Sequence, residues 1–152
     1  MTTDEGSELA PARLRALTSW QANKVATLGA RLTAQRMPLG ARADFAVLAA
    51  LEEYGALSQA ELGRRLGLDR NDVNAIVTRI EVRGHIDREP DPADRRRNIV
   101  SLTRSGAKHL DELQRHADVV QRELLAGLSE REQAQLRSLL TKLLGAHQPQ
   151  PG

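Results

Sequence analysis

Residues 58–106 read SQAELGRRLGLDRNDVNAIVTRIEVRGHIDREPDPADRRRNIVSLTRSG, and this stretch decides the fold. Ser58 and Glu61 have the Ser-x-x-Glu spacing of a capping box, so a short helix is expected to begin there and to end at Gly67. Asp69 is then placed to cap a second helix, which runs to about Arg83. Two short helices joined by a tight turn that contains glycine form the helix-turn-helix pattern.

After Gly84 the pattern of apolar residues changes from helical spacing to alternation. Residues 85–89 and residues 98–102 alternate as strands do, and a charged segment, residues 90–97, joins them. The sequence therefore predicts a β-hairpin with a charged tip, attached to the end of the second helix.

Helices are expected on both sides of this stretch. One helix runs from Pro11 to about Arg36 and another from about Ala41 to Tyr54. After Thr103, apolar residues step by three and four as in a coiled-coil seam, at Leu110, Leu113, Ala117, Val120 and Leu124. A second capping box, residues 129–132, begins a last helix with a broad apolar stripe made by Leu136, Leu139, Leu140, Leu143 and Leu144.

These elements define a mainly α fold with a small β-hairpin wing, which is a winged helix-turn-helix with N- and C-terminal dimerisation helices. We expect a single domain over residues 1–152, with a DNA-binding lobe at 41–106, dimerisation helices at 11–36 and 107–147, and disorder at 1–9 and 148–152. The terminal apolar stripes are wider than a lone helix on a small domain needs, so a two-fold partner would cover them in a homodimer. The alternative is that these stripes close the core of the monomer.

The composition limits the class of protein. At 152 residues the chain fits one domain, and it has no apolar run of the roughly 20 residues that a membrane span needs. Residues 1–9 lack the basic and apolar stretches of a secretory signal, so a cytoplasmic location is expected. Without cysteine the chain has no disulfide, no thiolate zinc site and no cysteine redox switch. One Trp, one Tyr and one Phe offer no platform for unpaired bases.

The charged residues permit a polyanionic partner. Net charge is only +2, yet 19 of the 22 basic residues are arginines, because Lys24, Lys108 and Lys142 are the only lysines. Arginine suits bidentate contacts with phosphate and guanine. Codon bias in a GC-rich genome would produce the same excess.

The hairpin carries a resemblance to a known family. Residues 91–97 (DPADRRR), residues 100–103 (VSLT) and Gly106 resemble the wing of the MarR (multiple antibiotic resistance regulator) family and the helix start that follows it. Further positions also match the family pattern, namely Leu62, Leu66, Gly67, Leu68, Val73, Arg79, Arg83, Gly84 and Arg88, so the resemblance runs from about Phe45 to Gly106. It implies a homodimeric transcription regulator that binds double-stranded DNA.

The second helix carries residues able to read DNA. Apolar residues recur at helical spacing toward the core, which leaves four polar residues facing out: Arg70, Asn71, Asn74 and Thr78. A helix fits the major groove, where Arg pairs with guanine and Asn with adenine, and where Thr78 would meet a phosphate or a thymine methyl group. Ser58 and Gln59, at the positive end of their helix, are placed for a phosphate contact. The alternative is a solvated polar face.

Three adjacent arginines at the hairpin tip repel one another, a cost that a nearby polyanion would remove. A narrow minor groove is the expected partner. The resemblance implies that Arg96 inserts into this groove, that Asp94 holds the Arg96 guanidinium in place, and that Arg95 and Arg97 meet phosphates. The alternative is a surface charge run without function.

The resemblance also implies a small aromatic, often anionic, effector that binds between the dimer helices and the DNA-binding lobe and releases DNA. Trp20 with Arg13 and Arg15 on the first helix, and Phe45 on the next, would receive a planar acid. A structural tryptophan packed under its helix is the alternative. The absence of cysteine departs from the peroxide-sensing branch of the family, so oxidation sensing is not expected.

Enzymatic motifs are missing from the sequence. It has no Gly-rich phosphate loop, no His-x-x-x-His or Glu-x-x-His metal spacing, and no Ser or Cys nucleophile flanked by glycines. His109 and His116 share a helix face, but two solvated or core-edge histidines explain them without a metal. We therefore expect no catalysis, no cofactor and no metal.

The sequence thus predicts a repressor that binds a palindromic operator, with recognition helices about 34 Å apart. Two other classes stay open: a non-specific architectural DNA-binding protein and a winged-helix protein-interaction module. The polar character of Arg70, Asn71 and Asn74 favours the reader of DNA, because an interaction module would expose apolar residues there.

Overall fold

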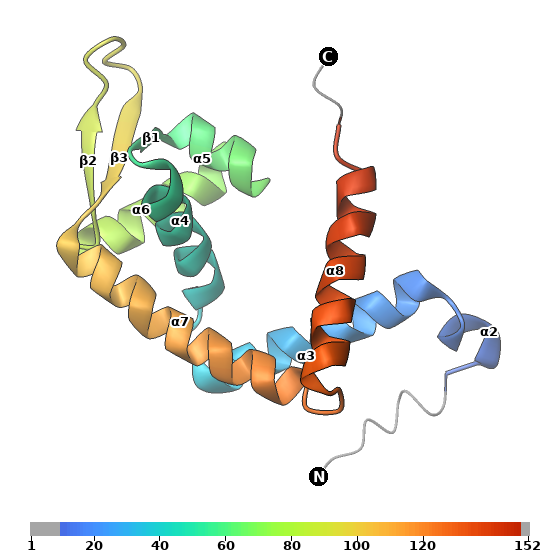
Figure 1. Ribbon diagram of the computed structural model, residues 1–152. Coiled ribbons are helices and arrows are strands. Elements are labelled where there is room, and N and C mark those ends of the chain that lie inside the picture. The colour runs from blue at the N-terminus through green and yellow to red at the C-terminus, as the bar shows by residue number, and fades with distance from the viewer. Residues whose placement is uncertain (1–9, 150–152) are drawn as a thin grey trace. The chain divides into compact units, whose positions relative to one another are not determined.

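The computed structural model describes residues 10–149, which are mainly helical with one small sheet (Figure 1). In chain order the elements are α2 (Ala12–Arg15), α3 (Thr18–Arg36), α4 (Ala41–Tyr54), β1 (Leu57–Ser58), α5 (Gln59–Leu66), α6 (Arg70–Val82), β2 (Ile86–Pro90), β3 (Asn98–Leu102), α7 (Arg104–Leu124) and α8 (Glu130–Ala146). The predicted mainly α, winged helix-turn-helix fold is confirmed. The disorder expected for residues 1–9, and for 150–152, concerns residues outside the described part.

The chain divides into two compact units. The winged unit comprises residues 33–118, and the helical unit comprises residues 10–32 and 119–149 within the described range. The bounds expected for the dimerisation helices and the DNA-binding lobe stay predictions. None of the helices in residues 10–149 is long and apolar enough to cross a membrane.

The sheet of the winged unit has three strands in the order β1-β3-β2. β2 and β3 form the expected antiparallel hairpin, from the pair Ile86 and Leu102 to the pair Pro90 and Asn98 at the tip side. β1, which the sequence analysis did not anticipate, pairs with the other edge of β3 and sets Leu57 opposite Val100. The start of α5 is therefore attached to the wing through the sheet.

The helix-turn-helix is built from local signals. Asp69 Oδ1 accepts a hydrogen bond from the Asp72 amide at 2.8 Å and caps α6 as expected. Gly67 adopts a φ of 66° at the end of α5, where a side chain would strain the backbone. At Gly63 a Cβ would lie 2.9 Å from the Leu68 carbonyl oxygen, so the close turn between α5 and α6 requires glycine.

The capping box predicted at Ser58 forms only one of its two hydrogen bonds. Ser58 Oγ accepts from the Glu61 amide at 3.1 Å, but among the described residues the Ser58 amide does not donate to the Glu61 carboxylate. That carboxylate instead pairs with Arg64 and, at 2.9 Å, with Arg65 Nε. The Glu61 carboxylate therefore forms ion pairs with basic residues one turn further along α5, in place of the second hydrogen bond of the capping box.

One apolar core holds the winged unit together. Its members come from α4, α5, α6, the sheet and the first half of α7, and they include the four α6 residues expected to face inward: Val73, Ile76, Val77 and Ile80. Leu110 and Leu113 of α7 are each 4% exposed within this core. The coiled-coil seam predicted through these two leucines is therefore wrong, because steps of three and four also suit a helix that packs on its own domain.

The helical unit differs from expectation at its start. The single helix predicted from Pro11 to Arg36 is wrong, because the chain is interrupted at Ala16 and Leu17 between α2 and α3. The Leu17 amide donates to the Leu14 carbonyl at 3.0 Å in a tighter turn. The Gln21 side-chain amide donates to the Arg15 carbonyl at 2.9 Å, which satisfies an oxygen that a continuous helix would have used.

Helix α8 begins with the predicted capping box, in which both bonds between Ser129 and Glu132 form. The hydrogen bond from the Ser129 amide, followed by that from the Ser129 side chain, holds the pKa of the Glu132 carboxyl below its ordinary value. The apolar stripe of α8 is exposed, and its four outward leucines are 43–66% accessible: Leu139, Leu140, Leu143 and Leu144. They do not pack into a core of the helical unit.

Candidate nucleic-acid interface

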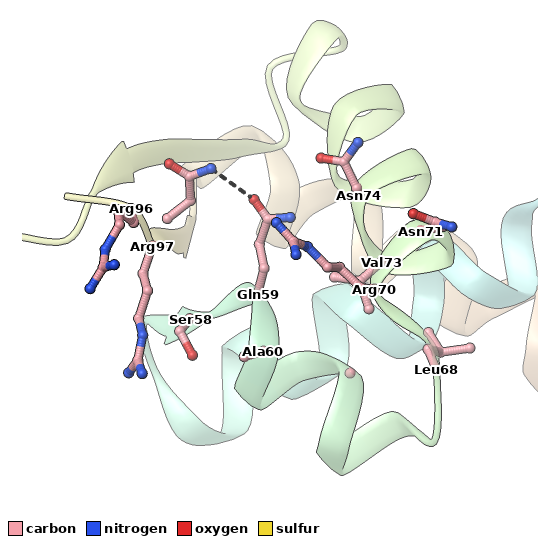
Figure 2. A pocket seen from close by; sticks show the side chains of 12 residues that line it. Ser58, Gln59, Ala60, Leu68, Arg70, Asn71, Val73, Asn74, Arg96 and Arg97 are labelled. Atoms are coloured by element: carbon pink, nitrogen blue, oxygen red, sulfur yellow. Dashed lines mark hydrogen bonds between the residues drawn. The ribbon is translucent and has the colours of Figure 1, made fainter. Parts of the chain in front are cut away.

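A groove of about 780 Å³ lies in the winged unit between the start of α5, the start of α6 and the tip end of the β2–β3 hairpin (Figure 2). It brings together seven side chains that the sequence analysis assigns to DNA contacts: Ser58, Gln59, Arg70, Asn71, Asn74, Arg96 and Arg97. Thr78, Asp94 and Arg95 are not among its lining residues. The lining contains three arginines and no carboxylate, so the groove is suited to a polyanion.

Helix α6 presents its polar face to solvent at this groove. Arg70, Asn71, Asn74 and Thr78 are exposed, whereas the apolar residues on the opposite face are buried. Figure 2 shows Asn71 and Asn74 projecting from α6, and Arg97 projecting from the hairpin loop just before β3. The face is thus free to meet a macromolecule.

Ser58 and Gln59 are less free than the sequence suggested. The Ser58 hydroxyl oxygen already caps α5. Gln59 Oε1 accepts a hydrogen bond from Asn98 Nδ2 at 3.2 Å, which joins α5 to the wing (Figure 2). For a phosphate contact Gln59 retains its amide nitrogen, and Ser58 retains its hydroxyl proton.

The hairpin tip is ordered by two aspartates. Asp94 Oδ1 accepts hydrogen bonds from the Arg96 amide at 3.1 Å and from Arg96 Nε at 3.2 Å, and Asp94 Oδ2 lies 3.6 Å from Arg97 Nε. The bond from the Arg96 amide, followed by that from its side chain, holds the pKa of the Asp94 carboxyl below its ordinary value. Asp91 Oδ1 accepts from the Ala93 amide at 2.9 Å. The Arg96 side chain remains 92% exposed.

Two sets of ion pairs on α6 had no role in the predictions from sequence. Arg88 of β2 donates to Asn74 Oδ1 at 3.3 Å and pairs with Glu81 of α6. At the start of α4, the carboxylate of Asp44 is 2% exposed and pairs with Arg79 and, at 3.8 Å, with Arg83. The matched positions of Arg79, Arg83 and Arg88 were the only signal in the sequence.

The residues expected at an effector site belong to different units. Arg13, Arg15 and Trp20 lie in the helical unit, where Arg15 Nε donates to the Ala10 carbonyl and Lys24 Nζ lies 5.5 Å from the Trp20 ring centroid. Phe45 lies in the winged unit, half-buried against its core. None of these four residues lines the groove of the winged unit or its smaller pocket of about 170 Å³.

A smaller pocket of about 170 Å³ occupies the winged unit and was not anticipated. It is lined by apolar residues and by Asp44, Arg83, His109, Glu112 and His116. The imidazoles of His85 and His109 stack nearby with centroids 4.3 Å apart. Burial, followed by His109 and Arg83, lowers the pKa of His85. No group of three potential metal ligands exists among the residues that the structure describes.

A capped short helix, a tight turn, a second helix and a hairpin that together enclose a basic groove define the winged helix-turn-helix class. A family model described as MarR family matches residues 41–97, which span α4, the helix-turn-helix and the hairpin as far as its tip. The HTH-type transcriptional repressor NicR of Pseudomonas putida is 36% identical over 101 residues, 66% of this chain and 64% of NicR, so less than two thirds of NicR is matched. The multiple antibiotic resistance protein MarR of Salmonella typhimurium is 33% identical over 102 residues, 66% of this chain and 71% of that protein. The chain belongs to the MarR family of transcriptional regulators.

Solved structures agree with this assignment. A crystal structure of a "probable transcriptional regulator" from Pseudomonas aeruginosa is similar with a TM-score of 0.76 and 35% identity, covering 86% of this chain and 99% of that one. BpsR of Bordetella bronchiseptica, whose DNA binding is regulated by 6-hydroxynicotinic acid, is similar with a TM-score of 0.72 and 26% identity, covering 82% of this chain and 96% of that one.

Proposed function

We propose that this protein is a ligand-responsive repressor that binds a palindromic operator in double-stranded DNA as a homodimer. The observation that carries the proposal is the groove of the winged unit, where amides and arginines from α5, α6 and the wing meet without a carboxylate. Arg70, Asn71, Asn74 and Thr78 would contact the major groove, and Arg96 would enter the minor groove with Arg95 and Arg97 on phosphates. Ser58 and Gln59 would donate to a phosphate.

The exposed leucines of α8 support the homodimer. Leu139, Leu140, Leu143 and Leu144 lie on one face of the helix, and water-exposed leucines in such a row favour burial against a partner. Leu14, Leu17 and Val25 of the helical unit are also more than a third exposed. A second copy of this chain supplies matching apolar surface in an isologous interface.

One similarity supports an effector. The DNA binding of the similar protein BpsR responds to 6-hydroxynicotinic acid, a small aromatic acid. The small pocket of the winged unit adds no support for an anionic effector, because the carboxylates of Asp44 and Glu112 line it beside Arg83, His109 and His116. Arg13, Arg15, Trp20 and Phe45 remain the effector residues that the family resemblance suggests.

The DNA-binding proposal is tested by selection from a library of randomised duplexes with the full-length protein. We expect enrichment of one palindromic sequence, with affinity that falls steeply as salt rises. Equal affinity for selected and random duplexes at fixed salt would indicate an architectural protein. Absence of salt-dependent binding would indicate a protein-interaction module.

The homodimer is tested by the double variant Leu140→Glu and Leu143→Glu in analytical ultracentrifugation. Two buried carboxylates per protomer would be costly, so we expect a monomer where the wild type sediments as a dimer. Ser138→Glu, on the opposite face of α8, is the matched control and should remain dimeric. A dimer that survives both leucine substitutions would contradict the proposed interface.

A further inference from the structure

Asn74 is an exposed groove residue whose side chain is held from behind. Its carboxamide oxygen accepts a hydrogen bond from Arg88 Nη1 at 3.3 Å. Asn74, Thr78 and Glu81 follow one another at steps of four and three on α6, so they share one stripe of the helix. Arg88, from strand β2, contacts both ends of this stripe.

Arg88 is itself fixed by an ion pair with two contacts. Arg88 Nη2 lies 2.9 Å from Glu81 Oε1, and Arg88 Nε lies 3.3 Å from Glu81 Oε2. The two side chains are only 19% and 34% exposed. A planar guanidinium held along one edge by both oxygens of a carboxylate has little freedom to rotate, so its remaining Nη1 donor keeps its direction.

The chemistry of this donor decides how the amide of Asn74 is oriented. A guanidinium only donates hydrogen bonds, so the atom that faces it must be the carboxamide oxygen. The flipped amide would set its own N–H groups against those of Arg88. The Asn74 amide nitrogen has no hydrogen-bond partner among the described residues, and it is left to donate to DNA.

We propose that Arg88, anchored by Glu81, is a positioning residue that fixes the carboxamide orientation of Asn74. Arg88 thereby selects the bases to which the Asn74 amide can donate a hydrogen bond. The inference rests on the proposed DNA-reading function and deepens it. In the major groove an amide N–H meets an acceptor on guanine, thymine or adenine, whereas the group that cytosine presents is the N4 amino donor. Discrimination against cytosine is therefore expected at the base that faces Asn74.

The test compares full-length wild type with three variants: Asn74→Ala, Arg88→Met and Glu81→Gln. Duplexes selected by the wild type are first compared for binding to the wild type and to Asn74→Ala. The operator position at which Asn74→Ala no longer prefers one base is the position read by Asn74. Matched duplexes that differ only there are then titrated at fixed salt. We expect the wild type to reject cytosine by about tenfold, and both Arg88→Met and Glu81→Gln to reject it by about threefold or less at that position alone.

The two variants change the net charge in opposite directions, which separates positioning from electrostatics. Loss of a phosphate contact in Arg88→Met would weaken binding to every duplex and make the salt dependence shallower, whereas Glu81→Gln would strengthen binding. Positioning predicts the same loss of base preference in both variants with an unchanged salt slope. Asp87→Asn, an exposed neighbour on β2, is the control and should keep the wild-type preference.

Distinct results would overturn the inference. If Arg88→Met or Glu81→Gln rejects cytosine as strongly as the wild type does, the positioning role of Arg88 is refuted while the proposed function stays intact. Uniform weakening with a shallower salt slope in Arg88→Met would assign Arg88 to a phosphate instead. A wild type that enriches no sequence would refute the proposed function, and the inference with it. Thermal unfolding monitors the fold, and Glu81→Gln decides alone if Arg88→Met does not fold.

Discussion

Replacing Arg96 by alanine is expected to weaken DNA binding and to flatten its dependence on salt. The Arg96 side chain is 92% exposed, and its ion pair with Asp94, at 3.2 Å, lies at the surface of the hairpin. Exposed pairs of this kind add little to stability, so the substitution should leave the fold unchanged. Any effect on binding then reports the contact with DNA.

The magnitude follows from counterion release. Each phosphate charge that a protein neutralises adds about −0.9 to the slope of log K against log salt. One arginine per protomer, and two per dimer, should therefore make the slope shallower by about 1.8. Relative to 1 M salt, this corresponds at 0.1 M to a loss of about eightfold for one arginine and about 60-fold for both.

The assay is a titration of the selected duplex, followed by fluorescence anisotropy at several salt concentrations between about 0.1 and 0.4 M, where the slope is well defined. Arg42→Ala is the matched control, because it removes the same charge from an exposed position of α4. An Arg96→Ala slope equal to that of the wild type would refute the role of the wing. So would an equal flattening by Arg42→Ala, since the effect would then reflect net charge alone.

Three further predictions concern stability and the wing. Gly106→Ala would drive a Cβ into the His85 carbonyl oxygen, so urea unfolding should show a loss of about 2 kcal/mol or more, whereas Gly127→Ala, with open space around it, should stay within about 0.5 kcal/mol. Because the pKa of His85 lies below the unfolded value of 6.5, the unfolded chain takes up a proton first on acidification; unfolding free energy should fall below about pH 6.5 more steeply in the wild type than in His85→Gln. Asp94→Asn removes a negative charge, which alone would tighten DNA binding, but loss of the bonds that hold Arg96 should weaken it instead; tighter binding in a titration would contradict the positioning role.

The sequence predicts the helix-turn-helix closely because its signals are local. Asp69 caps α6 through a bond to a residue three positions away, and Gly67 ends α5 through its own backbone conformation. Strand β1 was missed because it has two residues and pairs across more than 40 positions with Val100 and its neighbour Ile99. A pattern of alternation cannot be recognised in two residues.

Two helix predictions failed for different physical reasons. The break between α2 and α3 contains neither glycine nor proline, and it is accompanied by a hydrogen bond from the Gln21 side chain to the Arg15 carbonyl. The spacing of Leu110 and Leu113 describes a helix with one apolar face, but it does not say whether that face meets its own domain or a second chain. Only the buried position of these leucines in the winged unit decides the matter.

The outward residues of the candidate site could be predicted from the sequence, but the contacts that hold these residues and their helix in place could not. Outward positions on α6 follow from helical periodicity once the helix is placed. The contact of Arg88 with Asn74 and the pairing of Asp44 with Arg79 join residues 14 and 35 positions apart. Such contacts depend on how the hairpin and α4 pack against α6, which no local pattern contains.

These supporting contacts bear on the choice between a base reader and an architectural protein. Helix α6 is held at its start by Asp69, near its end by Arg79 and Arg83 on the buried Asp44, and from the wing by Arg88. Burying the Asp44 carboxylate is costly, and apolar residues in place of such a pair often stabilise a fold as well or better. Ion pairs add a fixed orientation, since each one holds one side chain at a defined position against another. Reading bases needs side chains placed to within about 0.5 Å, whereas phosphate contacts tolerate a looser helix. The tethering of α6 therefore favours sequence-specific recognition over general attachment to DNA.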